Sequence, residues 1–319
     1  MISKQYFILI VGVAALVGLA VGVNLKKIQW IDNKKTNIFD KTRRENKDLI
    51  FKNRIDSTQK VEPLRVGGTI YFAGERVPLE DPDVYERLDR ELQINAFWHS
   101  NTLLSMKLAN RYFPVIEKIL EEEGVPNDFK YLPLIESGFR DVISPSGAVG
   151  FWQFLSSTAK LYNLEIKNEV DERYHVEKST RAACAYLKTA KDKFGSWTTA
   201  AASYNLGMQA MAERCKSQGT YNYYELLLPQ ETARYIFRII AMKIIFSNPE
   251  AAGYYLKPDD LYQPFAFKTV QVDSSIQNIT AFAAKFGLQY RHIKLLNPWL
   301  RDNYLNNKEK KVYEIKILQ

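Results

Sequence analysis

The sequence predicts a mainly α protein, in which a helical domain is followed by a small α+β module near the carboxyl end. Apolar residues recur at helical spacing through residues 81–255, where strand signals are scarce. After Pro258 and Pro264 the pattern changes to strand, helix, helix, strand. With 319 residues, of which 46% are hydrophobic and 25% charged, the chain has enough apolar material for a sizeable core. A disordered or fibrous protein is therefore excluded.

The amino-terminal segment is an uninterrupted apolar run from Tyr6 to Val23, preceded by Lys4 and followed by Lys26. Its length is close to the ~20 residues that cross a bilayer as a helix. Residues 1–25 are therefore predicted to be an uncleaved transmembrane anchor, with a cleaved signal segment as the second interpretation. A buried helix of a soluble domain is disfavoured because the run has no polar face. Either interpretation implies that the rest of the chain is exported.

Residues 26–80 are predicted to be a basic linker or stalk. Residues 26–60 hold 11 Lys or Arg against 5 Asp or Glu, with no sustained apolar period. The chain as a whole carries a net charge of +8, but residues 61–255 hold 22 basic against 25 acidic residues. Because nucleic-acid enzymes concentrate positive charge on their working surface, we expect no nucleic-acid partner.

The helical domain is predicted to begin at Asp81-Pro82, with proline at the first helical position and apolar residues at every fourth position from Val84 to Ala96. The next apolar stretch predicts one long helix or two abutting ones, broken near Pro114 and closed by Gly124. Further helices are predicted over residues 129–135, 156–162, 176–194, 197–205, 208–215 and 232–246.

Glu136 stands out because it falls in the last turn of a predicted helix, just before the helix-stopping Gly138, with apolar residues around it. The negative end of the helix dipole and an apolar environment both raise the pKa of a carboxyl group. A carboxyl that stays protonated near neutral pH suits a general acid. The alternative is a glutamate that simply faces solvent beside an apolar strip.

Two further segments carry residues suited to ligand contact. Residues 144–154 combine Gly and Ser with aromatic residues on both sides of Gln153, a mixture suited to sugar rings. Residues 200–207 end an alanine-rich helix with a Tyr-Asn pair and Gly207 as its predicted cap. The structural alternatives are a loop packed under core aromatics and a helix whose small residues permit close packing.

Taken together, these segments resemble the lytic transglycosylases of glycoside hydrolase family 23 (SLT domain), of the membrane-bound lytic murein transglycosylase D type. The matching motifs are Glu136-Ser137, residues 147–154, Ser203-Tyr204-Asn205-Leu206-Gly207 and Glu231-Thr232-Ala233-Arg234-Tyr235. The resemblance runs from about residue 81 to residue 248. Two positions depart from the family pattern: Ser203 stands where Ala is usual, and Phe237 where Pro is common.

The resemblance implies a lysozyme-like fold for residues 81–255 and cleavage of the β-1,4 bond between N-acetylmuramic acid and N-acetylglucosamine in peptidoglycan. Glu136 matches the single catalytic acid and base of the family. Substrate-binding roles are implied for Ser137, Ser146, Gln153, Tyr204, Asn205 and Tyr235. In the family reaction the same glutamate acts first as acid and then as base, and the product carries a 1,6-anhydromuramoyl end.

Two alternatives to this function stay open. A hydrolytic, lysozyme-like muramidase would use a second carboxylate, for which the sequence offers Asp141, Glu165, Glu169 and Asp171. A non-catalytic peptidoglycan-binding or scaffold protein would need no carboxylate at all.

No metal or cofactor is expected. The three histidines, His99, His175 and His292, are far apart in the sequence. Export permits a disulfide between Cys184 and Cys215, but buried free thiols are an equally good interpretation.

The carboxy-terminal module, residues 262–319, resembles a LysM module. Strands are predicted over 267–272 and 312–318, with helices over 276–286 and 291–296 between them. LysM modules bind the N-acetylglucosamine backbone of peptidoglycan or chitin. Because Ser274-Ser275 replaces the usual Gly-Asp-Thr, the alternative of a packing domain that braces the catalytic core stays open.

The sequence thus predicts a peptidoglycan lytic transglycosylase of the cell envelope. The expected partner is the glycan strand of peptidoglycan. The expected location is the periplasm, with the protein anchored to the inner membrane by residues 1–25.

Overall fold

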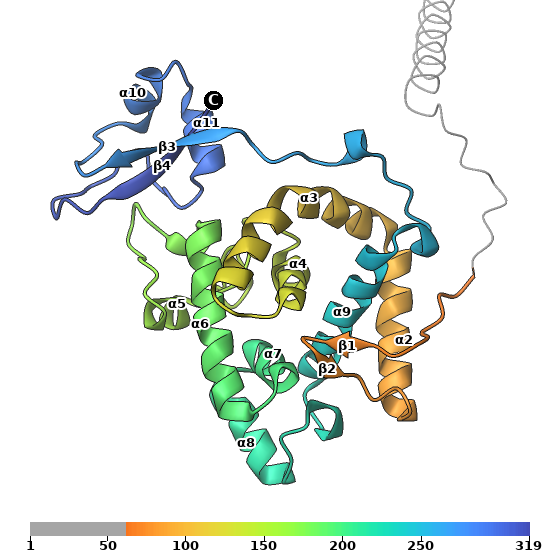
Figure 1. Cartoon of the computed structure of the whole chain (residues 1–319). Coiled ribbons are helices and arrows are strands. Elements are labelled where there is room, and N and C mark those ends of the chain that lie inside the picture. The colour runs from red at the N-terminus through yellow and green to blue at the C-terminus, as the bar shows by residue number, and fades with distance from the viewer. Residues whose placement is uncertain (1–61) are drawn as a thin grey trace, which may run out of the picture. The chain divides into compact units, whose positions relative to one another are not determined.

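A computed structural model describes residues 62–319, of which residues 63–319 form one compact unit (Figure 1). The predicted anchor, residues 1–25, and most of the predicted linker lie outside the described residues. Within residues 62–319 we find no helix with the length and apolar character needed to cross a membrane.

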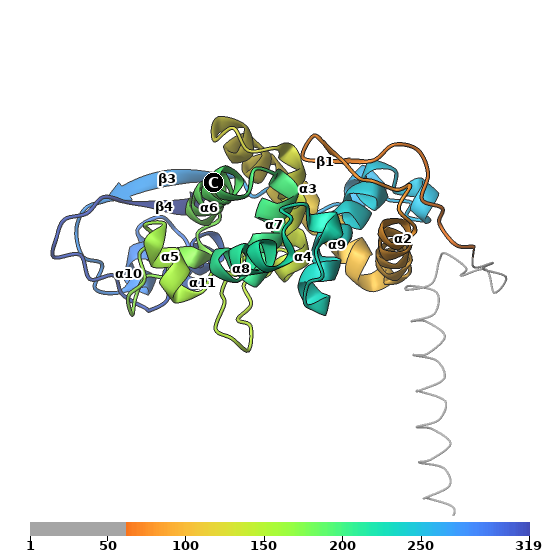
Figure 2. The ribbon, with the colours of Figure 1, turned by 90° about the horizontal axis from the view of Figure 1, so that it is seen from below.

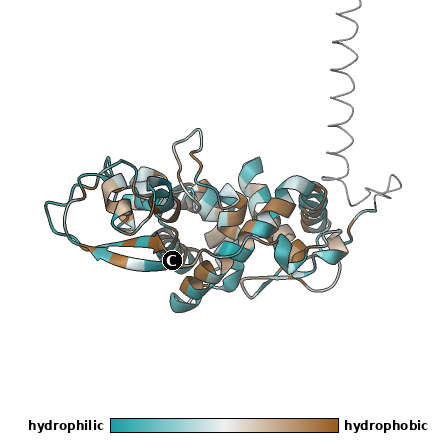
Figure 3. Cartoon of the chain, turned by 90° about the horizontal axis from the view of Figure 1, so that it is seen from above, coloured by the Kyte–Doolittle hydropathy of each residue, from teal (hydrophilic) through white to brown (hydrophobic). Residues whose placement is uncertain are grey.

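The predicted fold class is confirmed: the described chain is mainly helical, with a small βααβ module at its carboxyl end (Figures 1 and 2). The α-helices of the first part are α2 (Pro82–Phe97), α3 (His99–Glu122), α4 (Tyr131–Ser137), α5 (Ser156–Leu161), α6 (Val176–Phe194), α7 (Trp197–Leu206), α8 (Met208–Gln218) and α9 (Gln230–Ser247). Helix α2 packs along α9, and α6 packs along α7 and α3. Figure 3 shows apolar and polar bands alternating around these helices, as expected for helices that bury one face.

Helix α3 is continuous through Pro114, so the expected break at this proline is wrong. A proline inside a helix removes one backbone hydrogen bond and bends the helix, and α3 is visibly curved in Figure 1. Buried residues lie on both sides of the proline, including Ala109 before it and Ile116 after it. Tertiary packing of this apolar face therefore outweighs the lost hydrogen bond.

Residues 63–80, which we expected to belong to the linker, pack on the helical domain. Strands β1 (Tyr71–Phe72) and β2 (Glu75–Arg76) form a short antiparallel hairpin. Phe72 is fully buried, and Glu75 accepts hydrogen bonds from the backbone amides of Trp197 (2.6 Å) and Thr198 (2.9 Å). The hairpin thus supplies a carboxylate to the amino-terminal end of α7, where it complements the helix dipole.

The carboxy-terminal module contains β3 (Phe267–Val272), α10 (Ile279–Ala284), α11 (Tyr290–Leu296) and β4 (Tyr313–Leu318). The two strands pair antiparallel along their full length, from Phe267 opposite Leu318 to Val272 opposite Tyr313. The predicted order of elements is confirmed, although the first helix is shorter than expected. The module lies beside α5 and α6, at the end of the molecule opposite α2 (Figures 1 and 2).

Candidate active site

Glu136 lies on α4, one residue before its carboxy-terminal end. The helix stops at Gly138, which adopts a left-handed conformation (φ 60°) and donates its backbone N–H to the carbonyl of Leu134 (2.9 Å). Buried residues, among them Leu132, fix α4 in the core. The last turn of this short helix therefore holds Glu136 at the edge of the core, as the sequence indicated.

The environment of Glu136 favours the protonated carboxyl. Burial raises its pKa to about 7. The hydroxyl of Tyr235 donates a short hydrogen bond to Oε1 of Glu136, and this bond and the Arg238 guanidinium offset part of the increase. The carboxyl nevertheless remains partly accessible, and it lines a cavity. A proton donor with a pKa near neutrality thus faces a space that a ligand can occupy.

The cavity at Glu136 has a volume of about 510 Å³. Four of the other residues to which the sequence assigned a site role also line it: Ser146, Gln153, Tyr204 and Asn205. They come from the loop after α4 and from the end of α7, segments about fifty residues apart in the chain. Their convergence on one cavity was not deducible from spacing alone.

The loop of residues 144–154 is held in one conformation by its own backbone. Ser144 and Ala148 bond to each other through their backbones, and the hydroxyls of Ser144 and Ser146 lie 2.9 Å apart. Gln153 adopts a left-handed backbone conformation (φ 48°), and its Nε2 donates to the carbonyls of Gly150 (2.7 Å) and Val142 (3.2 Å). Because both amide hydrogens are used in the loop, the side-chain carbonyl of Gln153 is the group left for a ligand.

At the end of α7 the Tyr-Asn pair is also tied down. Tyr204 donates its hydroxyl to the backbone carbonyl of Trp152 (2.7 Å), so its ring lies against the loop. Asn205 accepts a hydrogen bond from the Thr232 hydroxyl at Oδ1 (2.8 Å), and its NH₂ group is therefore a donor for a ligand. Gln153 and Asn205 thus offer an acceptor and a donor to the same cavity.

Ser137 and Tyr235 are placed differently from our expectation of substrate contact. Both are buried, with exposed fractions of 4% and 1%, and neither lines the cavity. The Ser137 hydroxyl lies 3.0 Å from the carbonyls of Pro133 and Phe151, which joins α4 to the loop. Tyr235 contacts Glu136 through the hydrogen bond from its hydroxyl. Their positions suit holding the site together rather than touching a sugar.

The sequence reasoning missed several residues of the cavity wall. The additional wall residues with large side chains are Leu155, Leu161, Tyr162, Tyr186, Leu206 and Met208. Leu161 is the most exposed of them at 79%. These residues lie on helices or, for Leu155 and Tyr162, directly beside α5, so their pattern in the sequence is that of ordinary amphipathic helices. Only the tertiary arrangement makes them a wall.

The other candidate carboxylates lie elsewhere. Glu165 is bonded to Lys311 and Tyr313, and Asp171 forms a salt bridge with Arg173 (2.7 Å). Neither these two nor Asp141 or Glu169 line the cavity. Among the described residues that form the wall, Glu136 is the one carboxylate.

Within residues 62–319 no group of three or more His, Cys, Asp or Glu side chains is arranged to hold a metal ion. Cys184 and Cys215 are both buried free thiols, which decides between the two interpretations of this pair.

Comparison with known protein families finds two matching domains in the chain. Residues 113–227 match the transglycosylase SLT domain, and residues 268–318 match the soluble lytic transglycosylase C-terminal LysM-like domain. The chain thus carries an SLT transglycosylase domain followed by a LysM-like domain.

Two curated relatives are similar to parts of the chain. The chain is homologous to membrane-bound lytic murein transglycosylase D of Escherichia coli K12, with 26% identity over 243 residues. This match covers 73% of the chain and 52% of the relative. A putative tributyltin chloride resistance protein of Alteromonas sp. strain M-1 is 33% identical over 108 residues, which are 33% of the chain and 52% of that protein. The chain therefore spans about half the length of the curated relatives that it matches.

One solved structure is also similar, an inactive mutant of the lytic transglycosylase Slt from Pseudomonas aeruginosa. It has 17% sequence identity and a TM-score of 0.36, and the match covers 47% of this chain and 26% of that one.

Proposed function

We propose that this protein is a peptidoglycan lytic transglycosylase with Glu136 as its catalytic acid and base. The observation that carries the proposal is a cavity in which Glu136, with a pKa near 7, is the one carboxylate among the described wall residues. The SLT domain match and the homology to a lytic murein transglycosylase support the same reaction. The substrate is the β-1,4 bond between N-acetylmuramic acid and N-acetylglucosamine.

The proposed reaction has two steps. Protonated Glu136 donates its proton to the glycosidic oxygen as the bond to C1 of the muramoyl residue breaks. The resulting carboxylate then removes the proton of the C6 hydroxyl, whose oxygen bonds to C1 of its own ring. Because the nucleophile belongs to the substrate, its effective concentration is high and no second carboxylate is needed to activate water. The product is a 1,6-anhydromuramoyl end.

The residues around Glu136 have separable roles in this proposal. Ser146, Gln153 and Asn205 hold the sugar, the last two as hydrogen-bond acceptor and donor. Tyr204 supplies a ring surface. Tyr235 stabilises the carboxylate that remains after the first proton transfer, because its hydroxyl already donates to Glu136. Ser137 positions α4 against the loop.

The proposed organisation assigns catalysis to residues 81–255 and a LysM-like module to residues 262–319. We place the protein in the cell envelope, in agreement with the homology to a membrane-bound enzyme. Anchoring to the inner membrane through residues 1–25 is part of the proposal, with glycan strands of peptidoglycan as the partner.

The test is digestion of purified sacculi by the wild type, by Glu136→Gln and by the control Asp141→Asn. Glu136→Gln keeps the shape of the side chain and removes the proton transfer, so we expect a loss of about 10²–10⁴-fold in released muropeptides. Asp141 is exposed and outside the cavity wall, so its variant should retain activity near that of the wild type.

Retained cleavage by Glu136→Gln would refute Glu136 as the acid. Loss of cleavage in Asp141→Asn would instead favour a two-carboxylate hydrolase. A wild type that binds sacculi without cutting them would favour a scaffold protein.

A further inference from the structure

The core of the LysM-like module is separate from that of the helical domain, but the module does not build it alone. Its hydrophobic cluster includes three residues from the helical domain, Val149, Val170 and Tyr174. Val149 belongs to the loop of residues 144–154, whose opposite side lines the cavity. The loop that carries Ser146 and Gln153 therefore places one side chain, Val149, in the core of the module.

The backbone of the module also pairs with the backbone of the helical domain. Val170 and Leu300 form an antiparallel bridge, flanked by hydrogen bonds from Asp171 N to Trp299 O (2.9 Å) and from Arg301 N to Glu169 O (2.8 Å). The ring of Trp299 stacks on Tyr313 with 5.7 Å between centroids. Residues 299–301 thus act as a short strand added to residues 169–171.

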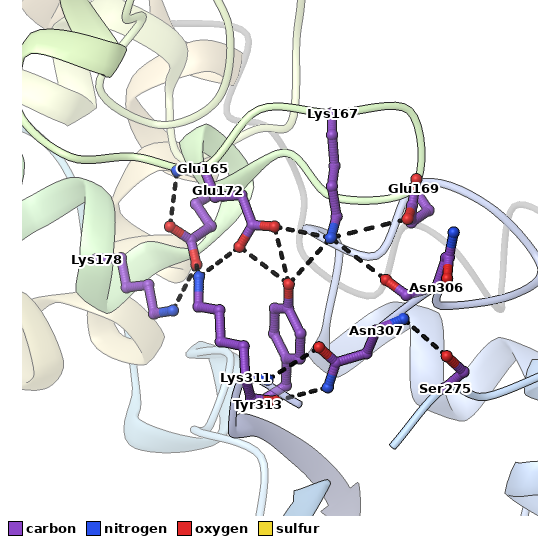
Figure 4. A network of polar contacts seen from close by, with 10 residues as sticks. All are labelled: Glu165, Lys167, Glu169, Glu172, Lys178, Ser275, Asn306, Asn307, Lys311 and Tyr313. Atoms are coloured by element: carbon purple, nitrogen blue, oxygen red, sulfur yellow. Dashed lines mark hydrogen bonds and ion pairs between the residues drawn. The ribbon is translucent and has the colours of Figure 1, made fainter. Parts of the chain in front are cut away.

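A polar network closes the same junction (Figure 4). Lys311 and Tyr313 of the module bond to the Glu165 carboxylate, to which Lys167 also pairs at 2.9 Å. Burial alone would raise the pKa of Glu165, but these hydrogen bonds outweigh it and hold the pKa at about 2. Glu172, which is 2% exposed, accepts from Lys178 in the same network. The junction is therefore charged and paired at neutral pH.

Arg173 connects this junction to the cavity loop. Its Nε and Nη2 bond to the Asp171 carboxylate, and its Nη1 donates to the carbonyls of Gly147 (3.2 Å) and Phe154 (3.1 Å). Gly150 packs so closely on the Arg173 carbonyl that a Cβ there would lie 2.9 Å from the carbonyl carbon and closer still to its oxygen. The Arg173 side chain thus bonds to two points of the loop, Gly147 and Phe154, and the Arg173 carbonyl lies against a third, Gly150.

We propose that the LysM-like module is a positioning element of the active site, which fixes the substrate-binding loop of residues 144–154 through Arg173 and Val149. The inference rests on the proposed function for the role of the loop in substrate binding. The contacts that join the module to the loop do not depend on that function. In this arrangement Arg173 is a positioning residue. The module therefore acts on the same sugar that the cavity binds, whether or not it also binds glycan elsewhere.

Two variants of the full chain test the coupling. Trp299→Leu removes the stacked ring at the junction, far along the chain from the cavity loop. Arg173→Lys keeps the charge beside Asp171 but cannot reproduce the fork that reaches Gly147 and Phe154. Tyr290→Leu is the matched control, because Tyr290 is a partly exposed aromatic on α11 that lies outside the module's core cluster.

The measurement is amide hydrogen exchange by mass spectrometry, read separately for residues 142–154 and for α7 and α9. Exchange in residues 142–154 should become at least about ten-fold faster in both variants and stay unchanged in the control. On soluble glycan strands KM should rise several-fold more than kcat falls, because the loop binds substrate while Glu136 stays in place. The pH at which activity is lost should not move.

Unchanged exchange of residues 142–154 in folded Trp299→Leu and Arg173→Lys would overturn the inference. If Trp299→Leu loses protection throughout the chain, Lys311→Met decides instead, because it removes the module's ion pair with Glu165; a selective change in the loop supports the inference and no change refutes it. Failure of the proposed function is distinguishable, because Glu136→Gln would then retain cleavage, whatever the exchange of the loop in Trp299→Leu shows.

Discussion

Glu136 combines a buried carboxyl, a hydrogen bond from Tyr235 and an open cavity within one helical turn. Burial raises its pKa to about 7, so the acid needed for the first step is present below this pH and is lost as the pH rises through it. We therefore expect kcat/KM to fall on the alkaline side with an apparent pKa near 7. Measuring the pH profile on soluble glycan strands tests this.

Tyr235→Phe should shift that profile in a defined direction. The hydroxyl of Tyr235 lowers the pKa of Glu136, so its removal should move the alkaline limb to higher pH and reduce the maximal rate by about ten-fold or more. Tyr254→Phe is the control, because the Tyr254 hydroxyl donates to the Ala96 carbonyl and not to Glu136. A limb that moves to lower pH in Tyr235→Phe would contradict this role.

Gly150 and Gly147 provide a matched pair of substitutions in the cavity loop. Both have a left-handed backbone, with φ of 77° and 81°, but only at Gly150 would an added Cβ collide with another segment, the Arg173 carbonyl. Gly150→Ala should lower the free energy of unfolding by about 2 kcal/mol or more, and Gly147→Ala by about 1 kcal/mol from backbone strain alone. Chemical denaturation of both variants measures the difference. Equal losses would show that the contact with Arg173 has no energetic weight.

At the scale of elements, α7 depends on a residue far from it in the sequence. Glu75 of the β1–β2 hairpin accepts from two amides in the first turn of α7 and from the Thr198 hydroxyl (2.6 Å). Since α7 carries Tyr204 and Asn205 in its last turn, the hairpin helps to set the cavity wall.

Glu75→Ala should therefore cost about 1–2 kcal/mol of stability, as loss of a helix cap does. The control is Glu80→Ala, which removes an exposed pair with Arg76 and should leave the melting temperature unchanged. Thermal unfolding of both variants is the measurement. An equal effect of the two substitutions would argue against the capping role.

The elements also show what the sequence could and could not predict. Helix positions followed from apolar periodicity, and Glu136 was singled out by its place before Gly138. The continuity of α3 through Pro114 was not predictable, because packing of its apolar face overrides the local preference for a helix break at proline. The β1–β2 hairpin was missed because strands of two residues have no periodic pattern in the sequence. The contacts of Glu75 with α7 exist only in the folded chain.

At the scale of the whole molecule, the helical domain has its own core and contributes Val149, Val170 and Tyr174 to the core of the LysM-like module. Their junction pairs residues 165–175 with residues 299–313, which lie more than a hundred positions apart in the sequence. No local sequence pattern indicates contacts between residues so far apart. The sequence therefore predicted the two parts but not the contacts between them. It left open whether the module binds glycan or braces the domain, and our further inference is that it braces the substrate-binding loop.

The contacts at this junction predict cooperative unfolding of residues 63–319. We expect one thermal transition, seen at the same temperature by helix content and by the fluorescence of Trp299 after Phe replaces the other tryptophans. Earlier loss of the Trp299 signal would show that the module unfolds independently and would contradict the coupling.

The central claim is that one carboxylate cleaves the glycan with the substrate's own hydroxyl as nucleophile. The most direct measurement is mass analysis of muropeptides released from sacculi by the wild type in water enriched in oxygen-18. A single-carboxylate transglycosylase should produce ends that are one water lighter than reducing ends and contain no heavy oxygen. Reducing ends that carry one heavy oxygen would show hydrolysis and contradict the claim.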